Sequence, residues 1–230
     1  MGYFSFVIPF GLVYWAEQFI PTGLASILFA AFPFFVIILA RFSFPGQRID
    51  PYQIIGVGLG FIGLLSIFSE SISFEHGYNI WGIIAIIVSA ALQSVNIIVM
   101  KKFGGHLNPL SMNFVPLFVA GVSLVSISLL AEDKTNWVFN ERAILSILYL
   151  AFFGSVITFT TYYWLLKRIN AVIISLSSFI TPIIAVLLGW IILDESLSLR
   201  DLMGSSCVLI GILFANLKGL KNYYILKVSK

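Results

Sequence analysis

The chain has 230 residues, of which 60% are hydrophobic and only 10% are charged, with a formal net charge of +3. Soluble globular proteins carry about 25% charged residues, so this composition excludes a water-soluble protein. The net charge could suggest nucleic-acid binding, but the basic residues are scattered at predicted helix ends, which membrane topology explains better. The single cysteine, Cys207, rules out an intrachain disulfide.

Apolar runs long enough to cross a bilayer recur along the whole chain. They are continuous and do not alternate as barrel strands do, so we expect helices. The fold class is therefore an all-α polytopic membrane protein with eight transmembrane helices. Their predicted ranges are 3–19, 22–42, 52–69, 80–100, 109–131, 143–166, 171–193 and 202–217. Pro9 and Gly11 interrupt the first of these, and Glu17 shortens its apolar run.

The basic residues predict the orientation of the helices. One side of the membrane would hold both termini together with Arg41, Arg48, Lys101, Lys102, Lys167, Arg168, Lys218, Lys221, Lys227 and Lys230. The other side would hold only Lys134, Arg142 and Arg200. Because short cytoplasmic loops are enriched in Lys and Arg, we expect both termini to be cytoplasmic, in a multi-pass protein of the cell membrane.

One stretch of the chain occurs twice. Four of its residues recur 149 positions later: Tyr14, Trp15, Ser26 and Pro33 as Tyr163, Trp164, Ser175 and Pro182. Gly56 and Gly63 recur 148 positions later as Gly204 and Gly211. The second copy begins five predicted helices after the first, an odd number, so the copies should be inverted. Inverted repeats are a common plan of secondary transporters, with the substrate site near the midplane.

The two halves are unequal in length. We expect residues 1–70 to form a partial first repeat of three helices and residues 78–218 a complete second repeat of five, followed by a basic cytoplasmic tail at 219–230. Moving residues 80–131 back by 149 positions would place two helices before Met1. We therefore expect an N-terminally shortened version of a ten-helix protein. A mis-called start, a gene fragment and a natural truncation all remain open.

These features resemble an EamA-type member of the drug/metabolite transporter superfamily. The similar features are the aromatic pair that ends one helix, the short loop, the small-residue helix with a central proline, and the glycine-rich closing helix. The resemblance covers nearly all of residues 3–217, without the first two family helices. It implies two five-helix inverted repeats and transport of small metabolites. An acidic residue commonly follows the proline helix in this family; Asp194 and Glu195 fit that place, whereas Gln47 occupies it in the first half.

Polar and aromatic residues inside the spans are candidates for substrate binding. Gln93 and Asn96 are three positions apart and share a helix face. They and Asn113 would either line a substrate path or hydrogen-bond between helices. The aromatic pairs would either form an interfacial belt or line a pocket for organic solutes. These pairs are Tyr14 with Trp15 and Tyr163 with Trp164.

Three further features have two interpretations each. Pro33 and Pro182 lie at matched positions and would act as hinges or as passive bends. Glu17 would either serve in proton coupling or contact a cationic substrate, or it would be a solvated residue at a helix end. The residues from Gly58 to Gly63 match a dinucleotide-binding pattern, but that pattern requires a preceding strand. Inside an apolar helix, Gly56, Gly60 and Gly63 instead predict close helix packing.

The sequence therefore predicts a secondary carrier that exports a small organic metabolite or amino-acid-like solute by alternating access. An inactive or accessory truncated membrane protein is the main alternative, and an integral membrane enzyme is a weaker one because no HExxH or GxSxG motif occurs. The only two histidines, His76 and His106, lack metal-ligand spacing, so no metal or cofactor is expected. The expected partners are a small-molecule substrate and the lipid bilayer, not nucleic acid, with a homodimer left open.

Overall fold

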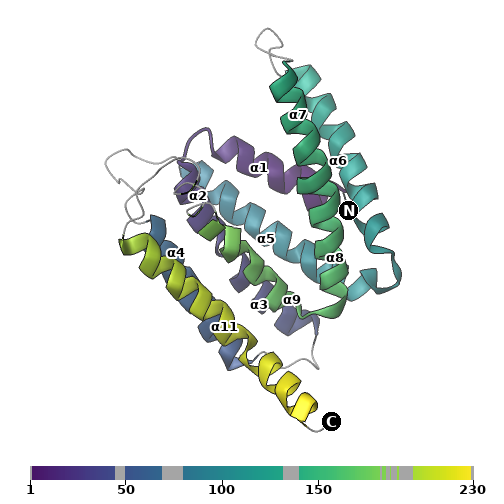
Figure 1. Cartoon of the computed structure of the whole chain (residues 1–230). Helices are drawn as coiled ribbons and strands as arrows, with labels where there is room; N and C mark the ends of the chain where they lie inside the picture. Colours follow the sequence, from purple (N-terminus) through teal and green to yellow (C-terminus); the bar gives the residue numbers. More distant parts are fainter. Residues whose placement is uncertain are drawn as a thin grey trace.

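A computed structural model describes residues 2–44, 50–68, 80–131, 140–181, 183–184, 187, 191 and 199–228. Every regular element among these residues is a helix (Figure 1). The prediction of an all-α protein is therefore confirmed. The long helices lie roughly alongside one another, as expected for a bundle whose apolar side chains face both lipid and neighbouring helices.

The elements follow the predicted order. The first half contains η1 (Tyr3–Val7), α1 (Ile8–Ala16), α2 (Thr22–Phe29), α3 (Phe32–Ser43) and α4 (Pro51–Phe68). The second half contains α5 (Ile80–Phe103), η2 (Gly104–His106), α6 (Pro109–Ala131), α7 (Glu141–Tyr149), η4 (Leu150–Ile157), α8 (Thr158–Arg168), α9 (Ala171–Ser175), η5 (Leu176–Phe179) and α11 (Leu199–Val228). Elements η1 and η4 are π-helical, and η2 and η5 are 3₁₀ helices.

Seven of the eight predicted spans coincide with apolar helices of the described chain. Four of these helices are long enough to cross a membrane, namely Leu24–Ser43, Ile80–His106, Pro109–Leu130 and Glu141–Arg168. Three shorter apolar helices are Tyr3–Ala16, Pro51–Ile67 and Leu202–Leu217. Much of the remaining span, 171–193, lies outside the described residues. The count of eight therefore stays a prediction.

Pro33 lies at a break inside the apolar span Leu24–Ser43, and its role as a hinge stays a prediction. Helix α2 ends at Phe29, and α3 starts at Phe32 with Pro33 in its first turn. The first turn is where proline is tolerated, because the missing N–H has no intrahelical acceptor there. In the second copy, α9 gives way to the 3₁₀ turn η5 just before the matched proline. Pro182 itself lies outside the described residues.

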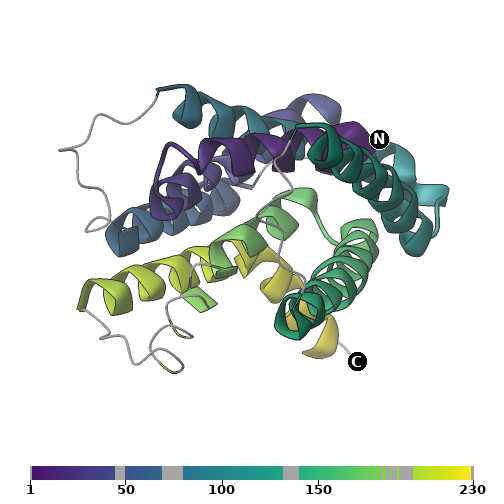
Figure 2. The ribbon, with the colours of Figure 1, turned by 90° about the horizontal axis from the view of Figure 1, so that it is seen from above.

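Helices α4 and α11 pack closely side by side (Figures 1 and 2). A Cβ added to Gly63 would lie 2.6 Å from the Gly204 carbonyl oxygen, and one added to Gly211 would lie 2.5 Å from the Gly56 carbonyl oxygen. Only glycine permits this approach of two backbones. The packing interpretation of the glycines is therefore confirmed, with Gly60 lying under the ring of Phe179.

A buried apolar cluster closes one end of the bundle. Five helices contribute to it. One buried residue from each of them, namely Val36, Ile97, Met112, Leu166 and Val172, makes up what we call the apolar seal. All five lie toward the end of the bundle where α5 and α8 finish, which we call the sealed end. The opposite end, where α1 finishes and α5 begins, is called the Glu17 end.

Candidate functional site

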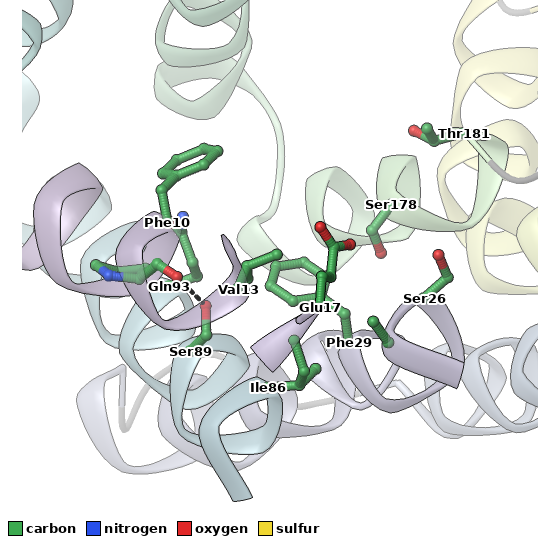
Figure 3. A pocket seen from close by; sticks show the side chains of 12 residues that line it. Phe10, Val13, Glu17, Ser26, Phe29, Ile86, Ser89, Gln93, Ser178 and Thr181 are labelled. Atoms are coloured by element: carbon green, nitrogen blue, oxygen red, sulfur yellow. Dashed lines mark hydrogen bonds between the residues drawn. The ribbon is translucent and has the colours of Figure 1, made fainter. Parts of the chain in front are cut away.

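A cavity lies between the two halves of the chain. One part, of about 290 Å³, lies toward the Glu17 end (Figure 3), and a second part, of about 300 Å³, lies deeper. Both parts are lined by the same five residues, Phe10, Phe29, Gln93, Ser178 and Thr181. We treat them as one central cavity. Its walls come from η1, α1, α2 and α3 of the first half and from α5, α8 and η5 of the second.

Two side-chain hydrogen bonds join the first helix to α5 along the cavity wall. The Ser89 hydroxyl donates to the Pro9 carbonyl oxygen at 2.9 Å, and the Ser5 hydroxyl donates to Asn96 Oδ1 at 2.7 Å. Ser5 and Ser89 are both buried. In an apolar environment such bonds are retained because a buried hydroxyl without a partner is costly. They set the position of this wall.

Aromatic rings form much of the deep part of the cavity. Phe6 meets Phe159 edge to face with ring centroids 4.9 Å apart, and Phe29 stacks on Phe32 at 5.8 Å. All four rings line the deep part together with the amides of Gln93 and Asn96 and the hydroxyls of Ser177, Ser178 and Thr181. Largely apolar walls with a few convergent polar groups are typical of small-molecule sites.

Lysine side chains tie the helices together at the sealed end. Lys101 Nζ donates to the carbonyl oxygens of Leu166 and Ile169, the second at 2.7 Å. Lys167 Nζ donates to the Leu107 carbonyl oxygen at 2.6 Å. The last carbonyls of a helix lack intrahelical donors and carry partial negative charge, so lysine stabilises them. Lys101 thus holds the end of α5 against the end of α8, and Lys167 holds the end of α8 against the connection between η2 and α6.

The sequence-predicted site residues divide into two groups. Gln93, Asn96 and Tyr163 line the central cavity, although Tyr163 is only 1% exposed. Tyr14 lines a separate apolar crevice between α1, α6 and η4. Trp15 packs edge to face on Phe19, and Trp164 lies under the Arg168 guanidinium, 3.8 Å from its ring centroid. Substrate binding by these residues stays a prediction.

Asn113 lies buried between α6 and the π-helical segment. Its Nδ2 group donates to the carbonyl oxygens of Ser155 and Val156, both at 3.2 Å, and to Thr160 Oγ1 at 3.0 Å. A π-helical register disturbs the usual backbone pairing, and Asn113 supplies donors there. It lines none of the cavities described above, so its position is that of an interhelical link.

Sequence reasoning missed several lining residues, although spacing could have found some of them. Ser89 lies four positions before Gln93 and therefore shares its helix face. Ser178 and Thr181 are three positions apart in the predicted span 171–193, just before Pro182, and also line the cavity. Phe10 and Phe29 gave no such signal, because apolar residues occur on every face of these helices.

The chain matches the model of the EamA-like transporter family over residues 1–69 and 80–217. Its relatives include the "Uncharacterized transporter YoaV" of Bacillus subtilis, 25% identical over 88% of this chain and 69% of the relative. "Protein PagO" of Salmonella typhimurium is 29% identical over 91% of this chain and 68% of the relative. The "Uncharacterized inner membrane transporter YedA" of Escherichia coli K12 is 24% identical over 94% of this chain and 69% of the relative.

A crystal structure of a protein with 19% sequence identity superposes with a TM-score of 0.82, covering 94% of this chain and 76% of the other. That similarity shows a shared fold. The chain spans about two thirds of the length of the relatives it matches. The family and the names of the relatives indicate a multi-pass membrane transporter rather than an enzyme. The family match covers most of the chain, and the chain belongs to the EamA-like transporter family.

Proposed function

We propose that the chain is a secondary carrier that moves a small organic solute by alternating access. The observation that carries this proposal is the central cavity, which reaches the Glu17 end with one part and borders the apolar seal at Ile97 with its deep part. Glu17 and Ser26, at the Glu17 end, are exposed. At the other end the apolar seal is buried, and Lys101 ties two helices together. A cavity that opens to one side of a bundle corresponds to one state of an alternating-access cycle.

The packing of α4 on α11 supports an inverted relationship of the two halves. Gly56 and Gly63 correspond to Gly204 and Gly211 in the repeat. In the fold Gly56 contacts Gly211, and Gly63 contacts Gly204. Gly56 therefore contacts the counterpart of Gly63, and Gly63 contacts the counterpart of Gly56, so the two glycine pairs run in opposite order along α4 and α11. Such a reciprocal contact is what a two-fold axis generates.

Equivalent residues of the two copies differ in exposure, as a carrier in one state requires. Tyr14 is 64% exposed, whereas its counterpart Tyr163 is 1% exposed. Ser26 is exposed, whereas its counterpart Ser175 is buried. In the opposite state of the cycle we expect the two copies to exchange these environments.

The charge pattern orients this state in the membrane. Lys101, Lys102, Lys167 and Arg168 gather at the sealed end. Because Lys and Arg favour the cytoplasmic side, we propose that the cavity opens outward and that both termini are cytoplasmic. Export of a metabolite or amino-acid-like solute is the direction we propose. The sign of the flux under an imposed solute gradient tests it.

Counterflow in proteoliposomes tests the carrier function. Vesicles holding the purified full chain are preloaded with unlabelled amino acids, amines, organic acids or sugars, and uptake of the labelled solute is followed. We expect at least one class to exchange, and Ser178→Trp to abolish the exchange by filling the cavity. The matched control is Ser206→Trp on the exposed face of α11, which should exchange normally. Equal flux in both variants, or none for any solute class with the unmodified chain, would contradict the proposal.

A further inference from the structure

Among the described residues, one side chain gives the central cavity its charge. Glu17 is the only side chain with a formal charge at neutral pH among the described residues that line it. The other polar groups are hydroxyls, two amides and the phenols of Tyr162 and Tyr163. An anionic solute would find no lysine, arginine or histidine on this lining, and would meet the Glu17 carboxylate. A cation would find a carboxylate and several aromatic rings.

The backbone that carries Glu17 is firmly placed. Ala16 and Ile20, on either side, are buried against α5. A Cβ added to Gly82 of α5 would lie 3.2 Å from Ile20 Cγ2 and 3.4 Å from the Ala16 carbonyl oxygen, so the two segments are in close contact. Figure 3 shows the Glu17 carboxylate directed into the pocket, toward the side of Ser178. The carboxylate is therefore held at the mouth of the cavity.

Local stability does not account for a carboxylate at this position. Glu17 is the C-cap of α1, where the helix dipole is negative and acidic side chains are unfavourable. Within the described part of the chain, its carboxylate forms no hydrogen bond or ion pair. A residue that breaks a local rule without a local compensation is expected at functional sites.

The repeat indicates which environment Glu17 would enter if the cavity closed above it. Its counterpart, 149 positions later, is Leu166. Leu166 is 0% exposed and belongs to the apolar seal. If the two ends exchange roles, Glu17 enters the environment that Leu166 has now. An unpaired carboxylate is far more costly to bury than a leucine, so closure at the Glu17 end requires that the carboxylate is either paired with a positive charge or protonated.

We propose that the central cavity takes an organic cation and that the Glu17 carboxylate binds its positive charge. Phe10 and Phe29 line the same part of the cavity as Glu17, and aromatic rings attract cationic head groups. This assignment rests on the proposed carrier function, because the closing step requires exchange between the two ends. The binding site itself is present in the state described here.

Equilibrium binding to the full chain in lipid nanodiscs tests the site. The probes are choline and its neutral carbon isostere 3,3-dimethylbutan-1-ol, which have the same shape and differ in charge. We expect choline to bind at least about tenfold more tightly. Glu17→Gln should abolish this preference, and Glu17→Asp should retain part of it. The control is Glu141→Gln, an exposed carboxylate in the first turn of α7 that lies outside the cavity.

Each outcome decides one of the two proposals. A folded Glu17→Gln chain that still prefers choline overturns the cation site, as does an unmodified chain without that preference. If choline is preferred in a Glu17-dependent way but no solute shows counterflow, the cation site stands and the proposed carrier function is wrong. A third outcome is that a pH gradient drives uptake of a neutral solute and that Glu17→Gln abolishes this uptake. This result would show that Glu17 binds the transported proton, and it would overturn the organic-cation site.

Discussion

At the scale of single residues, buried polar side chains fix the helices next to the cavity. The side chains of Ser5, Ser89 and Asn113 each form a hydrogen bond with another helix. In a membrane such bonds contribute modestly on average, about 0.6 kcal/mol each. A residue that serves several acceptors should contribute more.

Asn113 is the residue for which we expect the largest effect. Asn113→Leu keeps the volume but leaves the Ser155 and Val156 carbonyl oxygens without their side-chain donor. We expect the free energy of unfolding to fall by about 1–3 kcal/mol, measured by titrating the detergent-solubilised chain with SDS. Asn216→Leu is the control, since Asn216 Nδ2 bonds to Ile212 of its own helix. Equal losses in the two variants would contradict the role given to Asn113.

At the scale of helices, the contact between α4 and α11 depends on the absence of side chains. Gly63→Ala would place a methyl group 2.6 Å from the Gly204 carbonyl oxygen, and such overpacking costs about 1–3 kcal/mol. Gly58→Ala on the same helix meets no atom within 4 Å and should be neutral or stabilising, because alanine favours helices. Thermal unfolding of the two variants measures the difference. A Gly63→Ala chain as stable as Gly58→Ala would show that the helices separate without cost.

The lysine ties between α5 and α8 predict how the sealed end opens. In a Cys207→Ser background, Ile97→Cys reports on the seal because Ile97 is buried there. We expect Lys101→Met to speed labelling of this cysteine by an impermeant maleimide from the sealed end about tenfold or more. Lys102→Met, one residue away and exposed, should leave the rate unchanged. The background substitution keeps a donor in place, because a serine hydroxyl replaces the Cys207 thiol that donates to the Leu59 carbonyl oxygen.

The helices could be predicted because an apolar run of membrane length is a local property of the sequence. The glycine packing could also be predicted, since only small residues allow close approach. The π-helical turn η4 could not be predicted, because its carbonyl groups at Ser155 and Val156 are bonded by Asn113, which is more than 40 positions away in the sequence. The same holds for the site. The shared wall position of Gln93 and Asn96 could be predicted from their spacing, whereas the hydrogen bond of Asn113 to Ser155 could not, because it depends on how two distant helices pack.

At the scale of the whole molecule, the orientation in the membrane can be tested directly. Single cysteines in the Cys207→Ser background report each side of the bilayer. We expect Lys102→Cys, at the sealed end, to react with an impermeant maleimide only from the cytoplasm, and Asn140→Cys only from outside. The physical reason is the retention of Lys and Arg on the cytoplasmic side. The reverse pattern would place the opening of the cavity on the cytoplasmic side.

The continuous helix from Glu141 to Arg168 has a consequence for the lipid around the protein. Its 28 residues correspond to a length of about 42 Å at 1.5 Å per residue, whereas the hydrocarbon core is about 30 Å thick. The helix must tilt strongly or carry its ends into the head-group region. A thicker bilayer would let it stand more upright. Because Lys101 is bonded to the last turn of this helix, bilayer thickness acts on the sealed end through the tilt of α8.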